Sequence, residues 1–250
     1  MTPIPQGRNR RAALVRAMCA LVVAATGLAG CAEDPDEGTN GVGRLSAEKI
    51  QSRTRAAAQS ATAVRLHGSV VSSGRTYTLD MQLKPDGATG SVTAQGATFQ
   101  LLRVGEQLYL KADAEFWGHG DGQDGGRADA AAAGKLDGKY VKVPQGDPSY
   151  QKFSGFTDKD VLLDGLLTLH GTLETDGHHE QAGVRTIRIT GDKGSGGTLD
   201  VSLEGKPYPL RLVRAGGAGT LRFSAWGQDF PVKKPSKDET VDYGKQLPTS

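Results

Sequence analysis

The feature that most constrains the fold is a strict alternation of apolar and polar side chains along most of the chain after residue 64. In the clearest example, residues 77–83 read YTLDMQL and end in the turn KPDG. Successive side chains of a β-strand point to opposite faces, so this period of two indicates strands with one buried face. The same alternation appears in residues 99–101, 108–110, 167–173, 187–189, 199–203, 208–212 and 221–223.

The loops between these strands are short and rich in glycine. Glycine contributes 35 of the 250 residues, and three late turns read GSGG, GKP and GGAG. Short turns join antiparallel neighbours, because parallel strands need a long crossover. The sequence therefore predicts a meander of about nine or ten antiparallel strands with one apolar face.

Three segments of this β-rich chain are predicted to be helical. Ser46 can cap a helix over residues 47–62, whose apolar stripe consists of Ile50 and small alanines. Residues 148–153 and 157–166 form a second helical region in the middle of the chain, whereas the glycine-rich segment 118–134 is expected to be a mobile loop. The fold class is therefore α+β, a curved antiparallel sheet with the helices on its concave face.

The first 30 residues have the pattern of a secretion signal. Arginines at positions 8, 10 and 11 precede an apolar run, Ala17–Ala25. The run is shorter than a membrane-spanning helix requires, although a segment that stays attached to the membrane is the alternative. The pair Arg10-Arg11 leaves open whether export follows the general or the twin-arginine route.

The signal ends in Leu28-Ala29-Gly30-Cys31, which resembles the lipobox of bacterial lipoproteins. Small side chains admit the backbone to a peptidase, and the Cys31 thiol becomes a thioether to diacylglycerol. Acylation of the new amino terminus, for example by palmitate, would supply the further chain that stable anchoring needs. A buried structural thiol would not explain this position. We therefore expect a lipid anchor at Cys31 and a location on the extracytoplasmic face of the cell membrane.

The organisation that follows is a signal peptide over 1–30, a flexible tether over 31–44, a folded domain over 45–235 and a polar tail over 236–250. The tether is acidic and glycine-bearing, so it cannot bury an apolar face. All four basic residues before Cys31 would leave with the signal, after which 26 basic and 28 acidic side chains remain. This balance shows no basic stripe for nucleic acid.

Motifs of catalysis are missing from the sequence. His178-His179-Glu180 lacks the second histidine of a zinc motif and is expected in an exposed turn. The aspartates of the 118–134 segment miss the spacing of a calcium loop. No P-loop and no nucleophile elbow occurs. We therefore predict no enzyme, no cofactor and no metal, with a hydrolase of unrecognised site as a remaining alternative.

The lipobox, the first helix, the meander, the mid-chain helices and the C-terminal run GKPYPLRL followed by SAWG and VKKP together resemble one known family. The chain is similar to the LolA-like half-barrel lipoproteins, specifically the LppX/LprG group, over roughly residues 45–235. This resemblance implies a half-barrel whose concave face holds acyl chains beneath the helices. It implies no individual binding residue, because the group shares no short ligand motif.

The predicted function is a membrane-anchored monomer that binds lipid or another apolar ligand, for transport or presentation in the envelope. A broad apolar face opposed by small helix side chains supports a cavity, since protein interiors are densely packed. The alternatives are a sheet that packs on itself and an envelope sensor that binds another protein. The expected cavity residues are those at the inward parity of the strands: Leu79, Met81, Leu108, Leu110, Leu199 and Val201.

Overall fold

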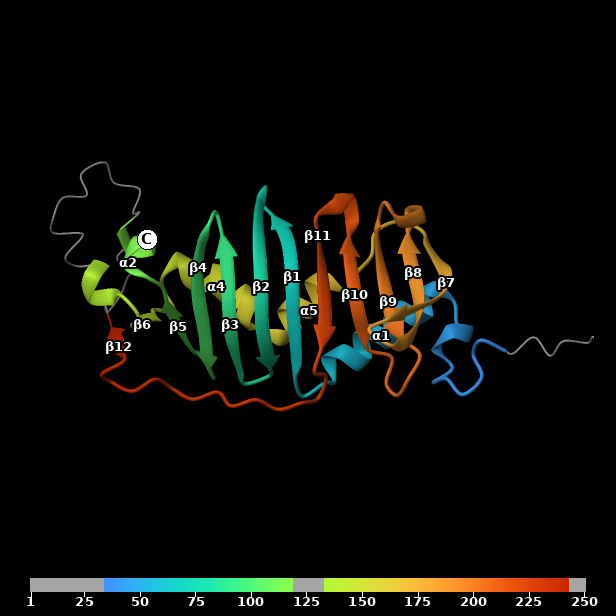
Figure 1. The fold of residues 1–250 in the computed structure, drawn as a ribbon, viewed down its shortest axis with the longest axis horizontal. Helices are drawn as coiled ribbons and strands as arrows, with labels where there is room; N and C mark the ends of the chain where they lie inside the picture. Colours follow the sequence, from blue (N-terminus) through green and yellow to red (C-terminus); the bar gives the residue numbers. More distant parts are fainter. Residues whose placement is uncertain (1–33, 119–132, 243–250) are drawn as a thin grey trace, which may run out of the picture. The chain divides into compact units, whose positions relative to one another are not determined.

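The computed structural model describes residues 34–118 and 133–242, which lie in two units, Met1–Glu37 and Gly38–Ser250. The signal segment, Cys31 and most of the glycine-rich segment lie outside the described residues. The second unit contains a 12-stranded sheet and helices (Figure 1). The strands are β1 Val64–Ser72, β2 Arg75–Lys84, β3 Gly87–Ala94, β4 Ala97–Val104, β5 Gln107–Lys111, β6 Tyr140–Val143, β7 Leu173–Gln181, β8 Val184–Gly191, β9 Gly197–Ser202, β10 Pro209–Arg214, β11 Gly219–Ser224 and β12 Thr240–Asp242.

The sheet is unclosed and mostly antiparallel, in the order β12-β6-β5-β4-β3-β2-β1-β11-β10-β9-β8-β7. Its one parallel pair among the described residues joins β12 to β6, with Val241 opposite Val141. The α+β class predicted from the sequence is confirmed. The estimate of about nine or ten strands is too low, and the expectation of a wholly antiparallel sheet fails at β12.

Three of the strands that alternation fails to predict, β3, β6 and β12, are short or made of small residues. β3 reads GATGSVTA and buries only small residues and one valine. A Cβ atom at Gly90 would lie 2.2 Å from the carbonyl oxygen of Asp80 and 2.7 Å from Cα of Met81, so only glycine fits there. β6 and β12 contain four and three residues, too few for a period to be recognised.

The prediction of a strand over residues 167–173 is wrong for a different reason. Leu167 ends a helix, Leu169 lies in the following loop, and β7 begins only at Leu173. Leu167 and Leu169 are buried at 1% and 6% exposure, so their alternation reflects packing of a helix end and a loop. His178 and His179 lie within β7 rather than in a turn, on an edge strand that is mostly exposed.

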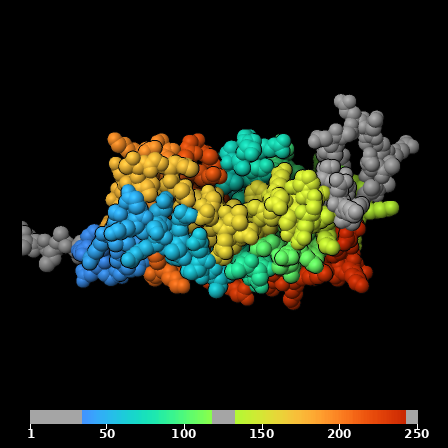
Figure 2. Space-filling model, turned by 180° about the vertical axis from the view of Figure 1, so that it is seen from behind, coloured from blue at the N-terminus to red at the C-terminus, as the bar shows by residue number. Residues whose placement is uncertain are grey.

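The helices lie on one face of the sheet, which we call the inner face. They are α1 Ala47–Gln59, α2 Ala114–Gly118, α4 Pro148–Thr157 and α5 Lys159–Leu166. α1 packs against β7 and β8, α4 against β3 and β4, and α2 against β4, while α5 contacts both α1 and α4. Figure 2 shows α1, α5 and α4 in succession across this face, in blue and yellow.

Side-chain caps set where the mid-chain helices begin. The Asp147 carboxylate accepts a hydrogen bond from Ser149 N, and Pro148 occupies the first turn of α4. The Asp158 carboxylate accepts hydrogen bonds from the backbone N–H groups of Asp160 and Val161, so Asp158 caps α5. These caps separate two short helices that together follow the inner face.

The chain between β11 and β12, residues 225–239, is extended and runs along the ends of the strands (Figure 1). We call this segment the C-terminal strap. Lys84 Nζ lies 3.2 Å from both Asp229 Oδ1 and the Phe230 carbonyl oxygen, and 5.3 Å from the centroid of the Phe230 ring. The strap thereby fixes the path by which β12 reaches β6.

Candidate functional site

Two tight hairpins have their tips at the same end of the central strands and form the base of the candidate site. Ser73 and Gly74 join β1 to β2, and Gln95 and Gly96 join β3 to β4. All four have positive φ, from 51° to 85°. Two-residue loops of this kind match the twist of antiparallel strands and keep the hairpin tips narrow. Helices α2 and α4 lie near this end of the strands, and both pack on β4.

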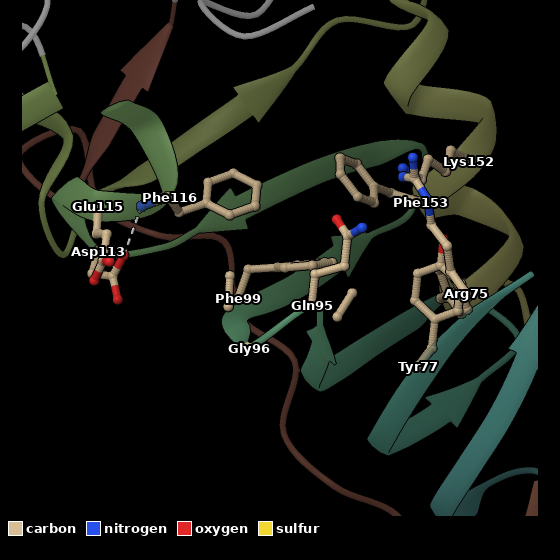
Figure 3. A pocket seen from close by; sticks show the side chains of 13 residues that line it. Arg75, Tyr77, Gln95, Gly96, Phe99, Asp113, Glu115, Phe116, Lys152 and Phe153 are labelled. Atoms are coloured by element: carbon tan, nitrogen blue, oxygen red, sulfur yellow. Dashed lines mark hydrogen bonds between the residues drawn. The ribbon is translucent and has the colours of Figure 1, made fainter. Parts of the chain in front are cut away.

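A pocket of about 570 Å³ opens between these hairpin tips and the two helices (Figure 3). This volume falls within the roughly 300–1,000 Å³ typical of small-molecule sites. Five of the lining residues are aromatic and four are charged, with small residues at the hairpin tip and the charges at the rim. The lining residues are Arg75, Tyr77, Ala94, Gln95, Gly96, Ala97, Phe99, Asp113, Glu115, Phe116, Lys152, Phe153 and Phe156.

The aromatic rings of the pocket are in contact with one another. The Phe99 ring lies 5.4 Å, centroid to centroid, from both Phe116 on α2 and Phe153 on α4. The Tyr77 ring lies 5.4 Å from that of Phe156. These distances are typical of favourable aromatic pairs. Figure 3 shows Phe116 and Phe153 approaching the pocket from opposite sides.

Small residues leave the pocket open. Ala94 and Ala97 are opposite each other in the β3–β4 register, at the point where the hairpin turns. Both line the pocket, whereas the next inward position of β4 carries the bulky Phe99. A large side chain at either alanine would occupy the space that the aromatic rings border.

The pocket continues the inner face of the sheet. Tyr77, Leu79 and Met81 are alternate residues of β2 and therefore share one face of the sheet. Phe99 and Leu101 are related in the same way in β4. The rows of apolar side chains that form the core therefore lead from the pocket into the interior. Tyr77 and Phe99 are 7% and 5% exposed, so the aromatic floor is already shielded from water.

Charged groups of opposite sign flank the pocket. In Figure 3, Arg75 and Lys152 lie on one side, and Asp113 and Glu115 lie on the other. Asp113 Oδ1 accepts a hydrogen bond from Phe116 N at 2.9 Å, and Glu115 also takes part in another interaction. Within residues 34–118 and 133–242, neither the Arg75 nor the Lys152 side chain has a hydrogen bond or ion pair.

The six residues expected to line a cavity all lie in the core. Leu79, Met81, Leu108, Leu110, Leu199 and Val201 are between 0% and 1% exposed. The parity deduced for them is correct, since all six belong to the core that the helices cover. None of the six lines the pocket described above. Their part in ligand binding stays a prediction.

Sequence reasoning did not identify the pocket residues. Tyr77 and Phe99 carry a signal, because both begin predicted strands at the inward parity. Phe116, Phe153 and Phe156 carry none, since their meeting with Phe99 depends on where α2 and α4 cross the sheet. Arg75 likewise follows a turn that looks ordinary in the sequence.

Asp200 is a buried ionisable group away from the pocket, and it is paired. Asp200, 1% exposed, accepts hydrogen bonds from Arg188 Nε at 2.6 Å and Arg188 Nη2 at 3.2 Å, and Arg211 lies 3.8 Å away. Such a compensated carboxylate links β8, β9 and β10.

No group of three His, Cys, Asp or Glu side chains in the described ranges is arranged to hold a metal. The described helices include none that is both long and apolar enough to cross a membrane.

Comparison with known proteins identifies similar folds and no close relative. No protein-family model matches the chain, and no curated protein matches it in sequence. LprF from Mycobacterium bovis superposes with a TM-score of 0.52 at 14% identity, covering 76% of this chain and 97% of LprF. The Mycobacterium tuberculosis lipoprotein LppX gives a TM-score of 0.45 at 16% identity, covering 74% of this chain and 99% of LppX. The resemblance to the LppX/LprG group predicted from the sequence is confirmed as a likeness of fold.

Proposed function

We propose that this chain is an exported lipoprotein, anchored through Cys31 to the extracytoplasmic face of the cell membrane, that binds an acyl-bearing ligand. The pocket at the ends of β2, β3 and β4 is the binding site or its entrance. It acts by holding a ligand rather than by transforming it, as a carrier or presenter of lipid within the envelope.

The observation that carries this proposal is an aromatic pocket continuous with the inner face of an unclosed sheet. Five aromatic rings border about 570 Å³, and the core residues Leu79, Met81 and Leu101 continue the rows of Tyr77 and Phe99. Burial of an alkyl chain there would stabilise the complex by about 0.8 kcal/mol per methylene group removed from water. The polar groups stay at the rim, where a ligand's headgroup meets solvent.

The likeness of fold to LprF supports the proposal without identifying a ligand. The two chains are similar in fold over 76% of this chain, with a TM-score of 0.52. The lipobox pattern ending in Cys31 agrees with that likeness, because an anchored domain would meet its ligand at a membrane surface.

The experiment that tests the proposal is to fill the pocket. Ala97→Trp places a large ring in the pocket and should strongly reduce binding of a fluorescent fatty-acid analogue. It should leave the melting temperature nearly unchanged, because the ring enters existing space rather than a packed core. Fluorescence titration and thermal melting are measured on the same samples.

Ala56→Trp is the matched control, since Ala56 is exposed on α1 and does not line the pocket. It should bind the analogue like the wild type. Absence of analogue binding by the wild-type protein would contradict the proposal and favour a protein-binding sensor. Undiminished binding by Ala97→Trp would contradict the assignment of this pocket.

A further inference from the structure

Four charged side chains lie at the rim of the pocket. They differ in whether they contact other groups of the protein, and this difference bears on the headgroup of the ligand. Asp113 Oδ1 accepts a hydrogen bond from Phe116 N, and Glu115 takes part in another interaction. The guanidinium of Arg75 and the ammonium of Lys152 are exposed, and within the described ranges they have no hydrogen bond or ion pair. On the side of the pocket formed by Arg75 and Lys152, two cationic groups therefore remain available to an anionic ligand.

The two cations are placed where a headgroup would lie. Arg75 follows the β1–β2 turn and precedes Tyr77 at the same parity of β2, so its side chain continues the row that enters the pocket. Lys152 directly precedes Phe153 on α4, the ring that contacts Phe99. Figure 3 shows both on the same side of the pocket. An anion between them would leave its alkyl chain against the aromatic rings.

The volume limits the number of chains. A methylene group is similar in size to a water molecule, whose share of liquid volume is about 30 Å³. A pocket of about 570 Å³ therefore has room for one long alkyl chain rather than several.

We propose that the pocket selects amphiphiles with a single alkyl chain and an anionic headgroup, a carboxylate or a phosphate, held by Arg75 and Lys152. This inference rests on the proposed function and specifies the ligand of the same site. Hydrogen bonds from cations to such oxyanions are stronger than those between neutral groups, and guanidinium groups bind them bidentately.

The test compares probes that share one alkyl chain: dodecyl phosphate, dodecanol and dodecyltrimethylammonium, each titrated calorimetrically into the purified full-length protein. Inorganic phosphate is a fourth probe. Dodecyl phosphate should bind about tenfold more tightly than dodecanol, with the cationic probe weakest and inorganic phosphate without measurable binding.

The double variant Arg75→Gln/Lys152→Gln should lose the preference for dodecyl phosphate and retain the affinity for dodecanol. Arg53→Gln, an exposed change on α1 away from the pocket, should leave the preference intact. Equal binding of dodecanol and dodecyl phosphate by the wild type, or an unchanged preference in the double variant, would overturn the inference alone. Inorganic phosphate binding as tightly as dodecyl phosphate would also overturn it. Failure of all three alkyl probes would overturn the proposed function together with the inference.

Discussion

At the scale of single residues, Arg65 and Asp80 stabilise the pairing of β1 with β2 on the outer face of the sheet. Arg65 Nε donates to Asp80 Oδ1 at 2.9 Å and Arg65 Nη2 donates to Asp80 Oδ2 at 2.8 Å. These hydrogen bonds hold the pKa of Asp80 below its ordinary value, although partial burial acts in the opposite direction. Because both side chains are more than a third exposed, the pair contributes little, about 0.2–1 kcal/mol.

The sign of the pH dependence follows from the lowered pKa. The stabilisation is fully present above the ordinary aspartate pKa of 3.8 and is lost as the pH falls through the lowered folded-state value. We expect Asp80→Asn to lower the free energy of unfolding by less than about 1 kcal/mol at pH 7, with a difference that shrinks in acid. Urea denaturation from pH 7 downward measures it. Arg65→Gln should show the same trend, and a difference that stayed constant below pH 3.8 would contradict the account.

Residue patterns predict the inner face of the sheet better than they predict the pocket. Parity along β2 correctly assigns Leu79 and Met81 to the buried side, because alternate side chains of a strand share a face. The meeting of Phe99 with Phe116 and Phe153 joins three separate elements. Its geometry is set by tertiary packing, which no local pattern encodes.

At the scale of elements, β12 shows how a polar tail contributes to the sheet. The tail over 236–250 contains the strand that pairs with β6 and places Val241 against the core. Lys139 Nζ donates to the Asp238 carbonyl oxygen at 2.8 Å, which ties the end of the strap beside this pairing. Three residues are too few to predict a strand from the sequence, so its presence depends on the edge that β6 offers.

Removal of residues 236–250 should therefore weaken the sheet at β6. We expect a lower melting temperature and faster amide hydrogen exchange at Tyr140, Val141 and Lys142, because their pairing with β12 is lost. Removal of residues 243–250 alone keeps β12 and is the matched control. Unchanged exchange at β6 in the longer truncation would show that β12 does not stabilise the edge.

At the scale of the whole molecule, the sequence predicts the class of fold and the order of its elements, and the structure adds their number and direction. The meander follows from local rules, whereas the capping residues of the mid-chain helices, Asp147 and Asp158, are established by the structure. The strand count is underestimated because β3 is built from small residues, and the parallel pairing of β12 requires the long path of the C-terminal strap. Neither feature has a local signature.

The proposed membrane anchoring concerns the whole chain and would depend on Cys31. Cys31→Ala should abolish acylation, because the thiol is the group that becomes a thioether, and leave either uncleaved precursor or released protein. Detergent phase partitioning and the intact mass of the product measure this outcome. A variant that partitions into detergent and has the same mature mass as the wild type would contradict the lipoprotein assignment.

The central claim is that the aromatic pocket holds an acyl-bearing ligand. Its most direct test is mass spectrometry of the non-covalent organic extract from the protein purified out of its membrane, with Ala97→Trp extracted in parallel. We expect an acyl-bearing compound in comparable molar amount to the wild-type protein and a marked depletion in Ala97→Trp. A wild-type extract without any such compound, or equal amounts from both proteins, would contradict the account.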